Sequence, residues 1–182
     1  MLLSVSETVR DLLASEVPGL SAGAVEIQQL HGDDGANLSQ NRLLLVLYHV
    51  QPNPHLRNEP PRLADDGYRY GPLYLTLRYL ITYISNDADA VQQRLAGVVT
   101  AFHRHSRIGP ERLAPDLVDQ VRDLRVTMRA MSSEELNQLW TALNRGMRLA
   151  LYYDVDVAPV EGGVPAGPTI SRREVRYVEP VR

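Results

Sequence analysis

The sequence predicts an α/β domain of the α+β type, in which a mixed, mainly antiparallel sheet of about four to six strands packs against three main helices. Two observations carry this prediction. Apolar residues recur at helical spacing in three segments, and several other segments alternate with a period of two or form short apolar runs. At 182 residues and 44% hydrophobic composition, the chain is long enough for one core without disulfide or metal support. We therefore expect a single core domain over residues 1–157, followed by a linker and an extended C-terminal arm over residues 158–182.

The first helix is expected from about residue 4 to residue 16. Ser4 and Glu7 have the spacing of a capping box, in which the two side chains satisfy backbone N–H groups of the first turn. Pro18 and Gly19 end the helix. Its apolar stripe consists of Val5, Val9, Leu12 and Leu13.

Two strands and a long excursion are expected next. Residues 24–30 are mildly strand-like, and residues 31–40 are rich in turn formers. Residues 42–51, RLLLVLYHVQ, are apolar on both faces, which is typical of a strand covered on both sides near the centre of a sheet. The excursion over residues 52–72 contains five prolines and two glycines. Long connections of this kind are often functional or partly disordered, so the excursion is a candidate for partner contacts.

A further strand and helix are expected over residues 73–105. Residues 73–84 alternate with a period of two, and their β-branched and aromatic content favours a strand over a helix. Asn86 and Asp87 begin the helix, which is expected to end near His105. Its predicted buried stripe consists of Val91, Leu95, Val98, Val99 and Phe102.

The last part of the core is expected to run strand, helix, strand. Residues 124–129 alternate as a strand. Ser132 and Glu135 have capping-box spacing at the start of a helix whose apolar stripe includes Trp140, which we interpret as an anchor in the core. The hydrophobic period then changes to two, which predicts one long strand over residues 147–157.

The composition excludes several classes of function. The formal net charge is −3 and the pI is about 5.9, which disfavours a general nucleic-acid binder because neutralising phosphates normally needs a basic face. The absence of cysteine excludes disulfide scaffolds, thiolate zinc sites and cysteine nucleophiles. The first residues carry no basic leader, and no apolar run approaches the roughly 18 residues of a membrane span. We therefore expect a soluble protein made in the cytoplasm.

All 19 basic residues are arginine. This composition has two interpretations. Arginine forms bidentate contacts with carboxylates and is enriched at protein interfaces, so the bias would serve recognition. A coding bias toward arginine and alanine explains the same composition more simply.

The sequence predicts no catalytic residue, no cofactor and no metal site. His103 and His105 lack the i, i+4 spacing that places two ligands on one helical face. Asp154 and Asp156 share one face of a strand, where they would bind a divalent cation or act as an acid/base pair. The favoured interpretation of this pair is a solvated face that limits edge-to-edge aggregation. A small metal-dependent enzyme that uses the two aspartates is thus only a remote alternative to a non-enzymatic protein.

Three segments together resemble a known family. They are LVLYHVQPNPHLRNEP (residues 45–60), LYLTLRYLITYISNDADAVQQRLAGVVTAFH (residues 73–103) and SSEELNQLWTALNRGMRLALYYDVDV (residues 132–157). In this order they resemble the cap, or tail-terminator, proteins of extracellular contractile injection systems, which are phage-tail-like particles. Two departures stand out. A serine expected early in the last strand is Ala150 here, and only the arm after Ala158 stands where longer relatives have an additional C-terminal region.

The resemblance implies a tail-terminator-like fold and a structural role without catalysis. It implies a homo-hexameric ring on the upper end of the inner tube and sheath, which ends their polymerisation and anchors the last sheath ring. The partners would be further copies of the chain and the tube and sheath proteins, with no nucleic acid and no membrane. Assembly would take place in the bacterial cytoplasm, in a particle that can be released from the cell. The alternative is an adaptor or connector elsewhere in such a particle, for example in the baseplate.

Two segments are expected to carry the contacts of such a protein. The first set lies at the start of the excursion and would contact an adjacent subunit or the tube: Asn53, Leu56, Arg57 and Asn58. The second set lies in the arm and would dock as a strand on the sheath or on a neighbour: Val175, Tyr177 and Val178. The alternatives are an ordered surface loop for the first set and a strand within the chain's own sheet for the second.

Overall fold

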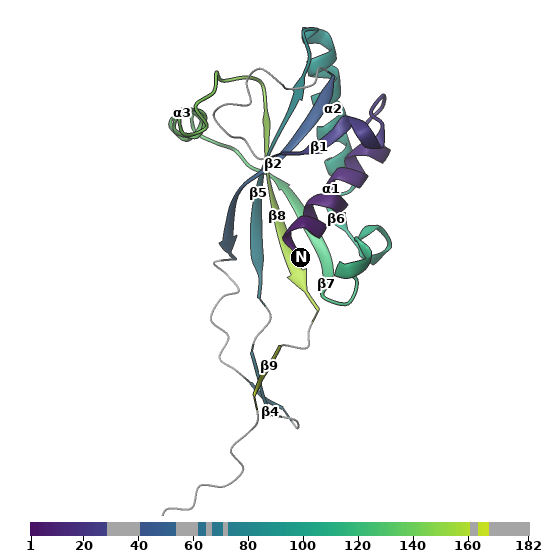
Figure 1. Ribbon diagram of the computed structural model, residues 1–182, viewed down its shortest axis with the longest axis vertical. Helices are drawn as coiled ribbons and strands as arrows, with labels where there is room; N and C mark the ends of the chain where they lie inside the picture. Colours follow the sequence, from purple (N-terminus) through teal and green to yellow (C-terminus); the bar gives the residue numbers. More distant parts are fainter. Residues whose placement is uncertain (29–40, 54–61, 65–66, 71–72, 161–163, 168–182) are drawn as a thin grey trace, which may run out of the picture. The chain divides into compact units, whose positions relative to one another are not determined.

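The computed structural model describes residues 1–28, 41–53, 62–64, 67–70, 73–160 and 164–167 (Figure 1). The chain divides into two compact units. The first combines Met1–Arg57 with Leu73–Val160, and the second combines Asn58–Pro72 with Glu161–Arg182. A six-stranded sheet belongs to the first unit and a three-stranded sheet to the second.

The six-stranded sheet is mixed and mainly antiparallel. Its strand order is β1-β2-β5-β8-β7-β6, and only the β1–β2 pair is parallel. The strands are β1 (Val25–Ile27), β2 (Arg42–Pro52), β5 (Leu75–Ile84), β6 (Arg107–Ile108), β7 (Val121–Met128) and β8 (Leu151–Pro159). The described residues contain three α-helices, which are α1 (Leu2–Glu16), α2 (Ala88–Arg104) and α3 (Ser133–Ala142). The predicted fold class is therefore confirmed.

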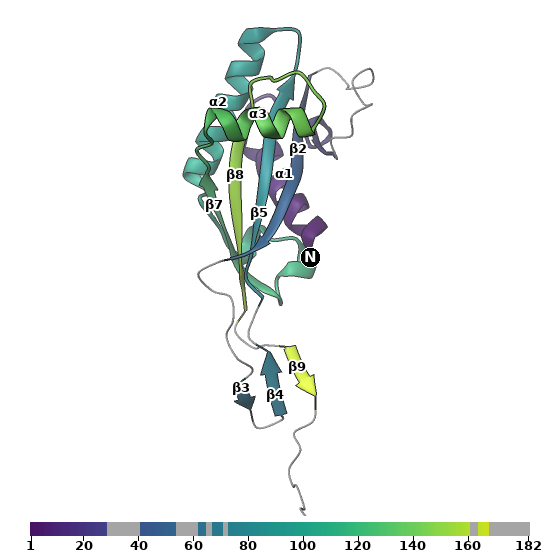
Figure 2. The same ribbon diagram turned by 90° about the vertical axis from the view of Figure 1, so that its left-hand side faces the viewer.

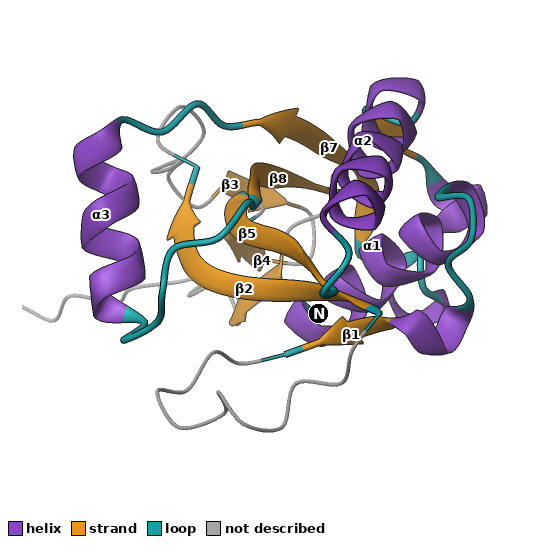
Figure 3. Cartoon of the chain, turned by 90° about the horizontal axis from the view of Figure 1, so that it is seen from above, coloured by secondary structure: helices purple, strands orange, loops and turns teal. Residues whose placement is uncertain are grey.

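The helices divide between the two faces of this sheet. Figures 1 and 3 show α1 and α2 on one face and α3 on the other. The side chains of β2 follow this division. Leu43 and Leu45 are buried in a larger cluster with α1 and α2, whereas Leu44 and Val46 are buried in a smaller cluster with α3. The prediction that this strand is covered on both faces is thus confirmed.

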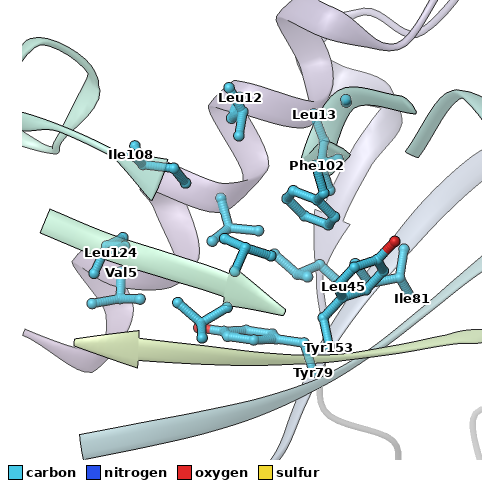
Figure 4. Packing of buried hydrophobic residues seen from close by; sticks show 14 of the residues in the cluster. Val5, Leu12, Leu13, Leu45, Tyr79, Ile81, Phe102, Ile108, Leu124 and Tyr153 are labelled. Carbon is cyan, nitrogen blue, oxygen red and sulfur yellow. The ribbon is translucent and has the colours of Figure 1, made fainter. Parts of the chain in front are cut away.

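The larger cluster joins α1 and α2 to the sheet. Figure 4 shows Leu13 of α1 and Phe102 of α2 directed toward the strands, with Tyr153 of β8 beside them. The rings of Phe102 and Tyr153 meet edge to face, and their centroids are 4.6 Å apart. Tyr79 is 1% exposed, and its hydroxyl lies 2.8 Å from that of Ser6 in α1. Burial raises the pKa of Tyr79 to about 12, so this phenol stays protonated at neutral pH.

The first helix begins earlier than the sequence predicts. α1 starts at Leu2, and no side-chain hydrogen bond caps it. The capping box predicted at Ser4 and Glu7 is wrong, because Ser4 lies buried within the helix and its hydroxyl donates to the carboxylate of Asp116. The Ser4 hydroxyl, which the local spacing assigned to the cap, is thus hydrogen-bonded to a residue distant in the sequence.

α2 follows the prediction at both ends. Asp87 caps it by accepting from the backbone N–H groups of Asp89 and Ala90, at 3.0 and 3.3 Å. The predicted buried stripe is wrong at Val99, which is 38% exposed, and Val91 is only partly buried, whereas Ala101 is buried. The apolar stripe is therefore narrower than the distribution of valines suggests.

The start of α3 and its anchor are as predicted. Ser132 accepts from the backbone N–H of Glu135 at 3.2 Å, and the Glu135 carboxylate accepts from the backbone N–H of Ser132 at 2.8 Å, so the capping box is confirmed. Trp140 is 3% exposed in the smaller cluster. Its indole N–H donates to the hydroxyl of Tyr152 at 2.9 Å. The interpretation of Trp140 as a core anchor is confirmed.

The long strand predicted over residues 147–157 is wrong at its start. β8 begins at Leu151, and the large side chains of Met147 and Leu149 are 67% and 55% exposed. The apolar alternation is present, but β7 ends at Met128, so no strand continues beside residues 147–150 on that side. The ladder between β5 and β8 also ends at Leu151, so the alternation of residues 147–150 is not accompanied by strand pairing.

The second unit holds three short antiparallel strands. β4 (Gly67–Tyr70) pairs with β3 (Arg62–Ala64) on one side and with β9 (Val164–Gly167) on the other. The first two strands come from the predicted excursion, and the third comes from the segment predicted as a linker. Residues 168–182, which make up most of the predicted arm, lie outside the described residues. Among the described helices, none is long and apolar enough to cross a membrane.

Candidate protein-interaction site

The sheet face that carries α3 is only partly covered by it. In Figure 2, α3 crosses one end of this face and leaves the remaining length of β2, β5, β8 and β7 without a helix over it. The strands are apolar where α3 packs, at Leu44, Val46, Leu80 and Tyr152. Farther along they become polar, and we call this polar part the open face. Its residues are His49, Thr76, Arg78, Asp123, Arg125, Thr127, Asp154 and Asp156.

Strand register arranges the open face in rows. Arg78 of β5 lies opposite Asp154 of β8. In the next row, Thr76 lies opposite Asp156, which in turn lies opposite Arg125 of β7. Residues that pair directly on neighbouring strands project to the same side of a sheet. Rows of charged and polar side chains therefore cross the middle of the sheet where it lacks a helix.

Asp154 lies between two arginines. Its carboxylate is 3.7 Å from Nε of Arg78 and 3.7 Å from Nη1 of Arg129, and the Arg129 guanidinium also donates to Glu135 at 2.9 Å. The side chain of Asp154 is only 25% exposed, and β8 lies inside the sheet. The favoured sequence interpretation, a solvated face that guards a sheet edge, is therefore wrong for this residue. Its charge is instead offset by the two guanidinium groups.

Asp156 connects the open face to the start of the excursion. Its Oδ1 atom accepts from the hydroxyl of Thr76 and, at 3.5 Å, from the side-chain amide of Asn53. The backbone N–H of Asn53 donates to the backbone carbonyl of Tyr74 at 2.9 Å, so Asn53 is held beside the start of β5. Among the predicted contact residues, Asn53 is placed next to the open face. The others lie outside the described residues: Leu56, Arg57, Asn58, Val175, Tyr177 and Val178.

Among the described residues, the two aspartates are not joined by further metal ligands. In the part of the chain that the structure describes, no group of three or more His, Cys, Asp or Glu side chains is placed to hold a metal ion. Asp154 faces arginines, and Asp156 accepts from a hydroxyl and an amide. Neither environment resembles the oxygen-rich shell that a hard divalent cation needs.

Three arginines surround one buried carboxylate at the β6–β7 edge of the sheet. The carboxylate of Asp123, which is 1% exposed, lies 2.7 Å from Arg107, 3.2 Å from Arg122 and 3.3 Å from Arg125. The arginine side chains themselves are 63%, 51% and 57% exposed. We call Arg107, Arg122 and Arg125 the arginine cluster. Its formal charge, with Asp123 included, is 3 − 1 = +2.

The arginine cluster keeps Asp123 ionised. Burial by itself raises the pKa of the Asp123 carboxyl, but the hydrogen bonds and charges of the three guanidinium groups, led by Arg107, outweigh it and lower the pKa below the usual value. Sequence reasoning missed this cluster. An acidic residue beside Arg122 and close to Arg125 is visible in the sequence, but Arg107 joins them only because β6 pairs with β7.

Comparison with protein families and curated proteins gives one match. A family model described as the Pvc16 N-terminal domain matches residues 4–172 of the chain. No curated protein matches the sequence at a significant level.

Solved structures with a similar fold include two terminator proteins. The first is the PVC sheath/tube terminator in its extended state, from an extracellular contractile injection system, with a TM-score of 0.64 and 16% identity, covering 100% of this chain and 64% of that one. The second is the anti-feeding prophage cap, a tube-terminating cap, with a TM-score of 0.58 and 20% identity, covering 97% of this chain and 62% of that one. The chain thus spans less than two thirds of the length of either structure, and the likeness at these identities is one of fold.

Proposed function

The chain belongs to the family of the Pvc16 N-terminal domain, and on that basis we propose that it is a cap, or tail terminator, of a contractile injection system. Six copies form a ring on the upper end of the inner tube and sheath. The ring ends polymerisation of both and anchors the last sheath ring. It is assembled in the bacterial cytoplasm, within a particle that is released from the cell. The observation that carries the proposal is the family match, which extends over residues 4–172.

The two edges of the six-stranded sheet support a ring. Contacts in a closed ring of six are heterologous, so each copy needs two different surfaces that complement each other. At one edge, β1 lies beside β2 and carries the ion pair of Glu26 with Arg42. At the other edge, β6 and β7 carry the arginine cluster. The two edges therefore present different side chains, which is compatible with heterologous contacts.

Omission of the chain tests the proposed function. Particles produced without it are expected to have inner tubes of uncontrolled length and sheaths that lack a fixed upper end, because nothing stops subunit addition. The length distribution is measured by negative-stain electron microscopy, with particles complemented by the wild-type chain as the control. Tubes of unchanged length with normal upper ends would contradict the cap function.

We further propose that the predicted contact residues serve this ring. Asn53, Leu56, Arg57 and Asn58 contact an adjacent subunit or the tube, and Val175, Tyr177 and Val178 dock as a strand on the sheath or a neighbour. The position of Asn53 beside the open face supports the first set.

Two variants test these contacts: Arg57→Ala and a chain that ends at Pro168, which keeps the nine strands that the structure describes. Both are expected to reduce ring formation, measured by mass photometry, while the circular dichroism spectrum stays unchanged. Arg112→Ala is the matched control, because it makes the same substitution at an exposed arginine that pairs with Glu16 within its own subunit. If either variant forms normal rings, the segment that it changes does not contribute to the contact between subunits.

A further inference from the structure

We propose that the arginine cluster is a preformed docking surface for an acidic segment of a partner protein. The cluster consists of Arg107, Arg122 and Arg125 around the buried Asp123 carboxylate. The proposal rests on the chemistry of this surface and does not depend on the cap function.

Local charge is unbalanced at the arginine cluster. Arg107 and Arg125 pair directly across the β6–β7 ladder. Like charges that lie directly opposite in a sheet are destabilising, and the single carboxylate of Asp123 offsets only part of the repulsion among the three guanidinium groups. Such local conflicts are expected at functional sites.

The three arginines are held in place while most of their N–H donors stay free. Asp123 is 1% exposed and fixes one nitrogen of each guanidinium group, at 2.7, 3.2 and 3.3 Å. A guanidinium group has five N–H donors in a rigid fork, and the three side chains are 51–63% exposed, so donors remain directed to solvent. Arginines that are already ordered lose less entropy when they bind a carboxylate.

The surroundings of the cluster limit the length of the partner segment. Asp156 lies opposite Arg125 on β8, so a further carboxylate borders the cluster on that side. A long polyanion such as a nucleic acid would be repelled there, and the net charge of −3 disfavours it over the whole molecule. A short segment with a few carboxylates can contact the arginine cluster without reaching the neighbouring Asp156. Its carboxylates would pair with the arginines in the bidentate geometry that arginine favours.

A titration with hexaglutamate peptide tests the proposal. The ¹⁵N-labelled protein is followed by NMR through the Nε–Hε resonances of its arginines. The resonances of Arg107, Arg122 and Arg125 are expected to shift in a saturable way, and salt is expected to weaken binding because the groups are exposed. Arg125→Gln is expected to weaken binding about tenfold, the loss of one charge-assisted contact.

The control is Arg112→Gln, since Arg112 is an exposed arginine paired with Glu16 outside the cluster. It is expected to leave the affinity for hexaglutamate unchanged. If Arg125→Gln fails to fold, the proposal is tested by the wild-type protein alone, through the shifts of its three cluster resonances on addition of hexaglutamate. Three results would overturn the proposal: cluster resonances that do not move, equal weakening by Arg112→Gln, or tighter binding of a DNA oligonucleotide than of hexaglutamate.

Discussion

Replacing Trp140 with alanine is expected to lower the free energy of unfolding by about 3–5 kcal/mol, as for other large-to-small changes of buried aromatic residues. Trp140 is 3% exposed and belongs to the cluster that joins α3 to Leu44, Leu80 and Ile84 of the sheet. The change removes this buried surface and leaves the buried hydroxyl of Tyr152 without its indole donor. Urea unfolding followed by circular dichroism measures the loss.

Trp140→Phe is the matched control for this experiment. It keeps most of the apolar volume and removes the hydrogen bond to Tyr152, so its loss is expected to be smaller. We assign Trp140 to the scaffold, with partner contacts elsewhere. A Trp140→Ala protein that is as stable as the wild type, yet fails to cap tubes, would show that α3 itself meets the partner.

Replacing Asp123 with asparagine is expected to lower the free energy of unfolding by about 1.5–3 kcal/mol at neutral pH. The substitution keeps the shape of the side chain but removes the negative charge that the three guanidinium groups share. Arg107 and Arg125, which lie directly opposite each other, would then repel each other without the charge of Asp123 to offset it. Urea unfolding at pH 7 measures the effect, and Asp119→Asn, at an exposed position near β7, is the control.

The effect of Asp123→Asn is also expected to depend on pH. The pKa of Asp123 is lower in the folded protein than its unfolded value of about 3.9. Its ionised form therefore stabilises the fold above pH 4, and this contribution is lost as the pH falls through the folded-state pKa. The difference in unfolding free energy between wild type and variant should shrink in acid. An equal difference at pH 7 and pH 3 would contradict the ionic role of Asp123.

Much of the fold could be predicted because local pattern and final structure agree. The capping box at Ser132 and Glu135, the N-cap at Asp87 and the doubly apolar run of β2 each depend on neighbours in the sequence. Local signals of this kind predict where elements start and which faces they bury. Each of the three segments that resemble cap proteins overlaps one of these elements, and the family match over residues 4–172 confirms that resemblance.

The errors arose where a distant partner decided the outcome. Ser4 has the spacing of a cap but bonds Asp116, and residues 147–150 alternate like a strand but have no β7 beside them. The same limit applies to the candidate site. Asp154 looked solvated because the arginines that flank it come from other segments, Arg78 on β5 and Arg129 after β7. Such side chains meet only through strand order, which periodicity does not specify.

A cryo-electron microscopy reconstruction of the upper end of the particle tests the cap function most directly. We predict a six-fold ring of this fold on the last ring of the inner tube, in contact with the last ring of the sheath. Density for this chain only at the baseplate, or an upper end closed by another protein, would contradict the proposed function.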